Sequence, residues 1–199
     1  NWCKLFRTFS RDCVAKELTP LSMPNLAANL SMLFTEYKFL DRFSAAAGHG
    51  FKGVEILFPY EWSANEIKYA LNENNLKQVL LNTPPGDLAS GDRGLGAVPG
   101  RESDFFSSLQ LALEFAETLM CKRIHVMAGI IEEEKEMQEA RATFVENLKR
   151  AADAAERYGV DLLIEPINDK RDIPGYFLSH VSDARKIIEE VGKENVGLQ

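Results

Sequence analysis

The stretch Val160-Asp161-Leu162-Leu163-Ile164-Glu165-Pro166-Ile167-Asn168 is a short apolar run that ends in a carboxylate. It follows residues 137–155, in which apolar side chains recur with the period of a helix and charged side chains occupy the opposite side. Another helical segment follows it and ends at Gly192, a residue that readily adopts the left-handed conformation of a helix end. A strand enclosed by two helices is the repeat of a parallel α/β sheet.

The same alternation extends along the chain from Met23. Strand-like runs are predicted at residues 26–31, 52–57, 76–82, 122–128, 160–166 and 195–199. Apolar stripes of helical period lie between them, at residues 39–47, 105–119 and 137–155. A chain with 45% hydrophobic residues can bury one substantial core.

A parallel sheet of six strands is either open and doubly wound or part of a closed barrel. Residues 194–199 read as a strand that has only begun, which favours a barrel whose remaining strands are not in this sequence. We therefore predict a (β/α)8 TIM barrel, of which residues 23–199 form roughly the first five and a half βα units. Residues 1–22 are expected to be a flexible or non-native extension, with a mitochondrial presequence as the alternative.

The charge balance and the cysteines limit the function further. The net charge of -7 opposes the neutralisation of phosphates, so nucleic acid is not expected as a partner. No run approaches the roughly 20 apolar residues of a membrane span, so we expect no membrane partner and a soluble, cytoplasmic protein. Cys3, Cys13 and Cys121 lack metal-ligand spacing and are expected to be reduced thiols.

Glu165 is the strongest candidate for chemistry. Active sites of TIM barrels lie at the carboxyl ends of the strands, where Glu165 is expected. Alternation along the strand puts Leu162 and Ile164 on one face, and Leu163 and Glu165 on the other, in a crowded barrel interior. Burial would raise the pKa of this carboxyl and suit it to general-base work, whereas a bound cation would keep it ionised. A structural salt bridge is the alternative role.

Other polar residues fall at predicted strand ends. His125 and Glu55 have the same inward orientation and are candidate substrate-binding residues, the alternatives being a core histidine and a structural ion pair. Asn29 and Asn82 are candidates to bind substrate oxygens, as is Asn168, although asparagine at such positions is also a common turn former.

Six blocks, in this order, resemble the hydroxypyruvate isomerase family of the xylose-isomerase-like barrel superfamily. They are residues 28–34 (ANLSMLF), 50–55 (GFKGVE), 82–87 (NTPPGD), 94–101 (GLGAVPGR), 123–129 (RIHVMAG) and 163–168 (LIEPIN). The resemblance covers residues 23–199.

This resemblance implies an isomerase that interconverts hydroxypyruvate and tartronate semialdehyde (2-hydroxy-3-oxopropanoate) through an enediolate. It also implies two glutamates and a divalent metal ion, Mg²⁺ or Mn²⁺, with Glu165 matching the first glutamate and serving as a metal ligand. The second glutamate is expected beyond Gln199, so the chain as given is expected to be inactive. Assembly into a homo-oligomer is left open.

A long connection, residues 83–101, follows the third predicted strand on the catalytic side and is expected to be a lid or binding loop. Its Gly94-x-Gly96 is not a dinucleotide fingerprint, because Pro99 takes the place of the third glycine. Arg101, together with Arg93, is a candidate to bind the substrate carboxylate, since guanidinium groups pair bidentately with carboxylates. Solvent-exposed arginines are the alternative.

Three other functions remain open at this point. A ketose epimerase or isomerase of the same superfamily would use similar chemistry. An apurinic endonuclease-like metal phosphodiesterase would need a site rich in histidine, whereas the chain has only His49, His125 and His180. A catalytically inactive fragment is the third.

Overall fold

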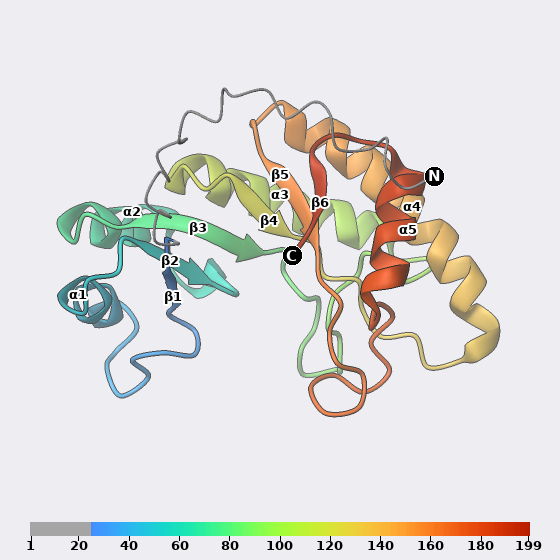
Figure 1. Cartoon of the computed structure of the whole chain (residues 1–199), viewed down its shortest axis with the longest axis horizontal. Helices are drawn as coiled ribbons and strands as arrows, with labels where there is room; N and C mark the ends of the chain where they lie inside the picture. The colour runs from blue at the N-terminus through green and yellow to red at the C-terminus, as the bar shows by residue number, and fades with distance from the viewer. Residues whose placement is uncertain (1–24) are drawn as a thin grey trace, which may run out of the picture.

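The computed structural model describes residues 25–199, in which six parallel strands alternate with five α-helices (Figure 1). The strands are β1 (Ala27–Asn29), β2 (Gly53–Ile56), β3 (Lys77–Asn82), β4 (Arg123–His125), β5 (Asp161–Ile164) and β6 (Val196–Leu198). The helices are α1 (Asp41–Gly48), α2 (Ala64–Glu73), α3 (Glu102–Leu119), α4 (Met137–Glu156) and α5 (Val181–Val191), with short 3-10 turns η1 (Pro59–Glu61) and η2 (Glu134–Glu136).

The strands pair in chain order, β1-β2-β3-β4-β5-β6, and every pair is parallel. All six strands predicted from the sequence are therefore confirmed, although each is shorter than its apolar run. The clearest difference is β4, predicted to reach residue 128 but ending at His125, because backbone groups of residues 127–131 bond to loops instead. This arrangement confirms the prediction of a partial TIM barrel.

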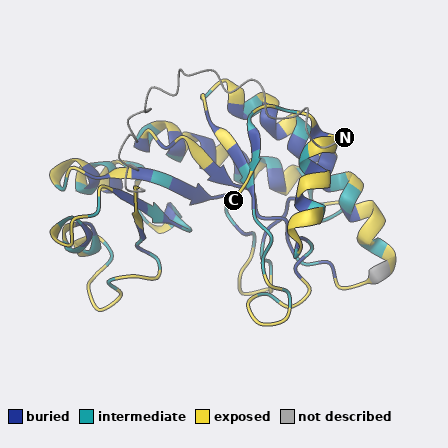
Figure 2. Ribbon diagram, in the orientation of Figure 1, coloured by how far each residue is buried: buried dark blue, intermediate teal, exposed yellow. Residues whose placement is uncertain are grey.

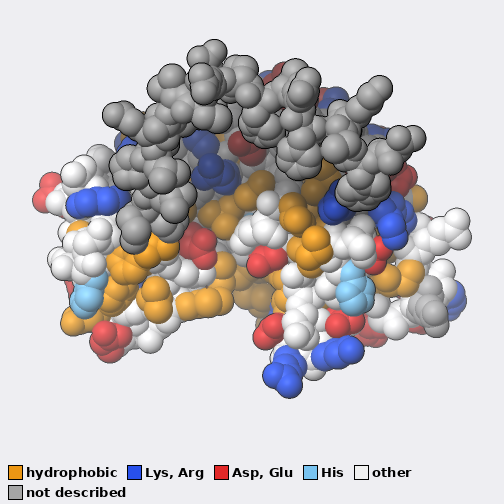
Figure 3. Space-filling model, viewed as in Figure 1, with side chains coloured by type: hydrophobic (Ala, Val, Ile, Leu, Met, Phe, Trp, Pro, Cys, Tyr) orange, Lys and Arg blue, Asp and Glu red, His pale blue; other side chains and the backbone are white. Residues whose placement is uncertain are grey.

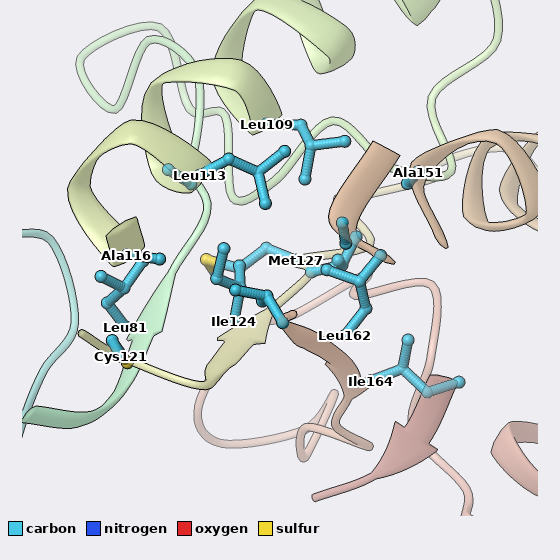
Figure 4. Close-up of a cluster of buried hydrophobic side chains, with 14 of the residues drawn as sticks. Leu81, Leu109, Leu113, Ala116, Cys121, Ile124, Met127, Ala151, Leu162 and Ile164 are labelled. Carbon is cyan, nitrogen blue, oxygen red and sulfur yellow. The ribbon is translucent and has the colours of Figure 1, made fainter. Parts of the chain in front are cut away.

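The main core lies between the sheet and its helices. Alternate strand residues, among them Leu81, Ile124 and Leu162, meet Leu109 and Leu113 of α3 in a buried cluster (Figure 4). Figure 2 shows the same division along the helices, whose inner sides are buried while their outer sides face solvent. Burial of each large apolar side chain contributes about 1.5–3 kcal/mol, so this packing fixes which face of the sheet the helices cover.

Local sequence explains where several helices begin and end. Ser63 and Glu66 form a capping box at the start of α2, in which each side chain bonds the backbone N–H of the other residue. Gly192 ends α5 in the left-handed conformation, as predicted. Met120 ends α3 in the same conformation, which its residue type does not predict.

The loop at residues 83–101, predicted to be a lid or binding loop, packs in part against its neighbours, and its role stays a prediction. Residues 94–97 are buried: the N–H groups of Gly96 and Ala97 donate to the carbonyls of Met127 (3.1 Å) and Ala128 (2.7 Å). The buried Asn147 of α4 donates to the Gly96 carbonyl at 2.9 Å. The tip, residues 87–91, is exposed, as is Gly100 just before α3. The glycines allow this close approach, because a Cβ on Gly94 would lie 2.6 Å from Met127 backbone atoms.

The predicted extension, residues 1–22, lies outside the described residues, as do Cys3 and Cys13. Cys121 is buried and unpaired within the described part, and burial raises the pKa of its thiol to about 11. No helix of residues 25–199 combines the length and apolar composition needed to cross a membrane. The cytoplasmic location stays a prediction.

A pair of glycine variants tests the close loop packing. Gly91 and Gly94 both have positive φ, +100° and +118°, so alanine should cost about 1–3 kcal/mol of unfolding free energy at either position. Only Gly94 has backbone atoms in the way, so Gly94→Ala should cost about 1–3 kcal/mol more than Gly91→Ala. Urea unfolding of both variants measures the difference. Equal destabilisation would contradict the close approach.

Candidate active site

Polar residues follow one another along the carboxyl ends of five consecutive strands. Asn29 ends β1, Glu55 is near the end of β2, Asn82 ends β3, His125 ends β4 and Glu165 directly follows β5. The register pairs Asn29 with Glu55, and Asn82 with His125. Acidic side chains border the hollow at the centre of the face shown in Figure 3. All five positions predicted from the sequence therefore lie at one edge of the sheet.

Asn29 and Glu55 form a hydrogen-bonded pair. The Asn29 Nδ2 donates to Glu55 Oε1 at 2.5 Å, and its Oδ1 accepts the N–H of Ser31 at 3.0 Å. The second bond leaves the amide nitrogen directed at the carboxylate. Burial raises the pKa of Glu55, and the bond from Asn29 opposes that rise by favouring the ionised form.

His125 is almost completely buried, with 1% of its surface exposed. Its Nδ1 lies 3.7 Å from Glu165 Oε2, and its Nε2 has no hydrogen-bond partner among the described residues. Burial lowers the pKa of the imidazole to about 4. The ring is therefore neutral near pH 7, so its contact with Glu165 is not an ion pair. One ring nitrogen of a neutral imidazole donates a hydrogen bond while the other accepts one.

Glu165 is less enclosed than the sequence predicts. Its side chain is 37% exposed, so within residues 25–199 it is only partly enclosed, whereas the sequence predicts a crowded interior. Burial nevertheless raises the pKa of the Glu165 carboxyl, and the negative charge of Glu55 raises it further. The two carboxylates thus repel one another across the site. A carboxylate with a raised pKa is a better proton acceptor near neutral pH.

Two tyrosines, the buried Tyr176 and the partly buried Tyr60, support the site without having been predicted. The Tyr176 hydroxyl accepts the N–H of Ala128 at 2.9 Å, and burial raises its pKa, as does the charge of Glu165. The Tyr60 hydroxyl donates to the Asn82 carbonyl. Neither tyrosine belongs to a periodic pattern. The only local signal is the Pro174-Gly175 turn before Tyr176.

Arg101 and Asn168 make contacts that local sequence explains. Arg101 pairs with Asp104 (2.5 Å) and Asp92 (3.5 Å) at the start of α3, and none of its described contacts reaches the carboxylate pair. Its role toward a substrate stays a prediction. Asn168 lies beyond the end of β5, and its Oδ1 accepts the N–H groups of Lys170 and Arg171. It is a turn former.

The described residues do not by themselves form a complete metal site. No group of three His, Cys, Asp or Glu side chains in this part of the chain is arranged to hold an ion. Glu165 nevertheless fits the role of one ligand, because its carboxylate is partly exposed and carboxylate oxygens are ligands that Mg²⁺ prefers.

Comparison with known proteins agrees with this arrangement. Residues 43–199 match the family model described as the xylose isomerase-like TIM barrel. A Cupriavidus necator protein named 2-oxo-tetronate isomerase is 52% identical over 177 residues, 89% of this chain and 68% of the relative. The Escherichia coli protein named hydroxypyruvate isomerase is 43% identical over the same shares.

Solved structures place the fold in the same group. A Brucella melitensis protein described as an AP endonuclease of family 2 has a TM-score of 0.86 at 45% identity, over 89% of this chain and 68% of its own. D-psicose 3-epimerase from Clostridium cellulolyticum H10 has a TM-score of 0.69 at 18% identity, over 86% and 61%, which shows the fold alone. The chain therefore belongs to the xylose isomerase-like TIM barrel family, in the group of the hydroxypyruvate and 2-oxo-tetronate isomerases.

Proposed function

We propose that the protein is an isomerase of short 3-hydroxy-2-oxo carboxylates, and that it interconverts hydroxypyruvate and tartronate semialdehyde. The observation that carries the proposal is Glu165, a carboxylate of raised pKa that faces Glu55 and His125 at the strand ends. The identity of 43% to a protein named hydroxypyruvate isomerase supports the choice of substrate.

The reaction moves a carbonyl between adjacent carbons. A base removes the proton from C3 of the 2-oxo acid, and the C2 and C3 oxygens share the charge of an enediolate. A proton then returns to C2, and the hydroxyl proton moves from the C3 oxygen to the C2 oxygen as the carbonyl forms at C3. No electrons leave the substrate, so no external oxidant or reductant is needed. Glu165 is the proposed proton acceptor, and a second carboxyl group is proposed to return a proton to C2.

His125 and the asparagines are proposed to hold the substrate oxygens. Because His125 is neutral and its Nε2 has no described protein partner, the tautomer with its proton on Nε2 can donate to an oxygen on which charge develops. Asn29 already directs its amide nitrogen at Glu55, so it would position that carboxylate beside the substrate. Asn82 ends β3, the strand between those that carry Glu55 and His125.

A divalent cation, Mg²⁺ or Mn²⁺, is proposed as the cofactor, with Glu165 as one of its ligands. When bound, such an ion stabilises negative charge on the substrate oxygens. Its positive charge would also offset the negative charge of Glu55. Burial, and after it the charge of Glu55, raises the pKa of the Glu165 carboxyl.

The substrate is tested with an active preparation of the protein and two 3-hydroxy-2-oxo acids. Hydroxypyruvate should be isomerised with the higher kcat/KM, and chelation of divalent ions should abolish turnover until Mg²⁺ or Mn²⁺ is restored. Preference for 2-oxo-tetronate is the specific alternative, because a relative with that name is 52% identical. If the preparation turns over neither of the two acids, the proposal is wrong.

A phosphodiesterase is the second candidate, favoured by the description of the Brucella melitensis structure as an AP endonuclease. The net charge of -7 weighs against it, because DNA binding relies on neutralising phosphates. Cleavage of a duplex with one abasic site, by a preparation inactive on both 2-oxo acids, would establish it instead.

Glu165→Gln tests the proposed base. The amide keeps the size of the side chain but cannot accept the proton, so kcat should fall by at least about a hundredfold while substrate still binds. Glu73→Gln, an exposed change on the outer helix α2, is the matched control and should leave kcat unchanged. Near-normal turnover by Glu165→Gln would remove this residue from the chemistry.

Glu55→Gln tests the repulsion between the carboxylates. Removing the negative charge of Glu55 makes ionisation of Glu165 easier, so the pKa of Glu165 should fall and the acid limb of kcat/KM should move to lower pH. Carbon NMR titration of the Glu165 carboxyl measures the shift directly. Glu61→Gln, which changes the same charge on an exposed residue of η1, should not move it. An unchanged titration in Glu55→Gln would contradict the coupling.

A further inference from the structure

A pocket lies at the opposite end of the strands from the site that contains Glu55 and Glu165. Its walls come from α2, the start of β3, the end of α3 and the start of β4, and it has a volume of about 430 Å³. The arrowheads of β3 and β4 in Figure 1 point away from it, toward the edge that carries Asn82 and His125. It is therefore separate from the site of the proposed isomerase and does not depend on that function.

The pocket is basic, although the chain as a whole is acidic. Lys68, Lys77, Lys122 and Arg123 line it, and no Asp or Glu does. Within residues 25–199, none of these four side chains forms an ion pair or a hydrogen bond with a protein group. In a chain of net charge -7, four cations without a described carboxylate partner form a local positive field suited to an anion.

Gln78 adds a polar group that the fold leaves unused. It lines the same pocket and is only 4% exposed. Its Nε2 donates to the Leu80 carbonyl at 2.7 Å, whereas its Oε1 has no hydrogen-bond partner among the described residues. An unpaired buried acceptor destabilises the fold, and an apolar side chain of the same size would avoid that penalty. The amide oxygen is an acceptor, so it complements a donor such as a hydroxyl rather than an anion.

We propose that this pocket binds a small phosphate ester that also carries a free hydroxyl. The phosphate dianion would pair with the lysines and with the guanidinium of Arg123, whose N–H groups match phosphate oxygens. The hydroxyl would donate to the Oε1 of Gln78. The volume of about 430 Å³ lies within the range of sites for small molecules.

Glycerol 3-phosphate is the probe, because it combines a phosphate with free hydroxyls, and inorganic phosphate is the comparison. Calorimetric titration of the 199-residue chain at low salt should show one saturable site that binds glycerol 3-phosphate more tightly. The double variant Lys122→Gln/Arg123→Gln should weaken binding at least about tenfold, since it removes two charged hydrogen-bond donors. Lys149→Gln, which removes one positive charge on α4 outside the pocket, should leave binding unchanged.

Gln78→Met separates the two parts of the ligand. It removes the amide acceptor but keeps the length of the side chain, so it should abolish the preference for glycerol 3-phosphate and leave phosphate binding intact; a thermal melt checks folding. Absence of saturable binding, or equal binding by the double variant and Lys149→Gln, would overturn the site. The cations would then only complement the carboxyl ends of α2 and α3. Retention of the preference in Gln78→Met would overturn the role of the amide.

Discussion

Every feature of this molecule depends on a parallel hydrogen-bond ladder in which neighbours in the chain are also neighbours in the sheet. Parallel pairing requires the chain to return to the same edge before each new strand, and the helices make that return. All carboxyl ends therefore meet at one edge and all amino ends at the other. Residues far apart in sequence, such as Asn29 and Glu165, are brought to one edge without any specific contact between them.

The electrostatics of the carboxylate edge follow from the two faces of the sheet. The helices bury most of one face, and at the other the polar side chains are partly withdrawn from water. Partial burial raises the pKa values of Glu55 and Glu165, while fuller burial keeps His125 neutral. The site thus combines two carboxylates that resist simultaneous ionisation with an imidazole that carries no charge, an arrangement suited to moving protons.

The loops at this edge are held together by backbone hydrogen bonds, to which the side chains of Asn147 and Tyr176 add. Residues 94–97 bond to residues 127–128, and residues 175–177 bond to residues 129–131, so three connections form one continuous layer. Glycines at the contact points allow backbones to meet where a Cβ would overlap them. At the other edge, the starts of β3 and β4 leave space between α2 and α3, where the basic pocket lies.

The sequence by itself determined the six strands, the helices, and the placement of Glu55, His125 and Glu165 at strand ends, because side-chain alternation and helical period are local properties. The tertiary structure alone decided the Asn29–Glu55 bond, the neutrality of His125 and the support from Tyr176. It also decided the burial of residues 94–97 and the gathering of four cations around Gln78. These depend on distances between distant segments and on exclusion of water, which no local pattern contains.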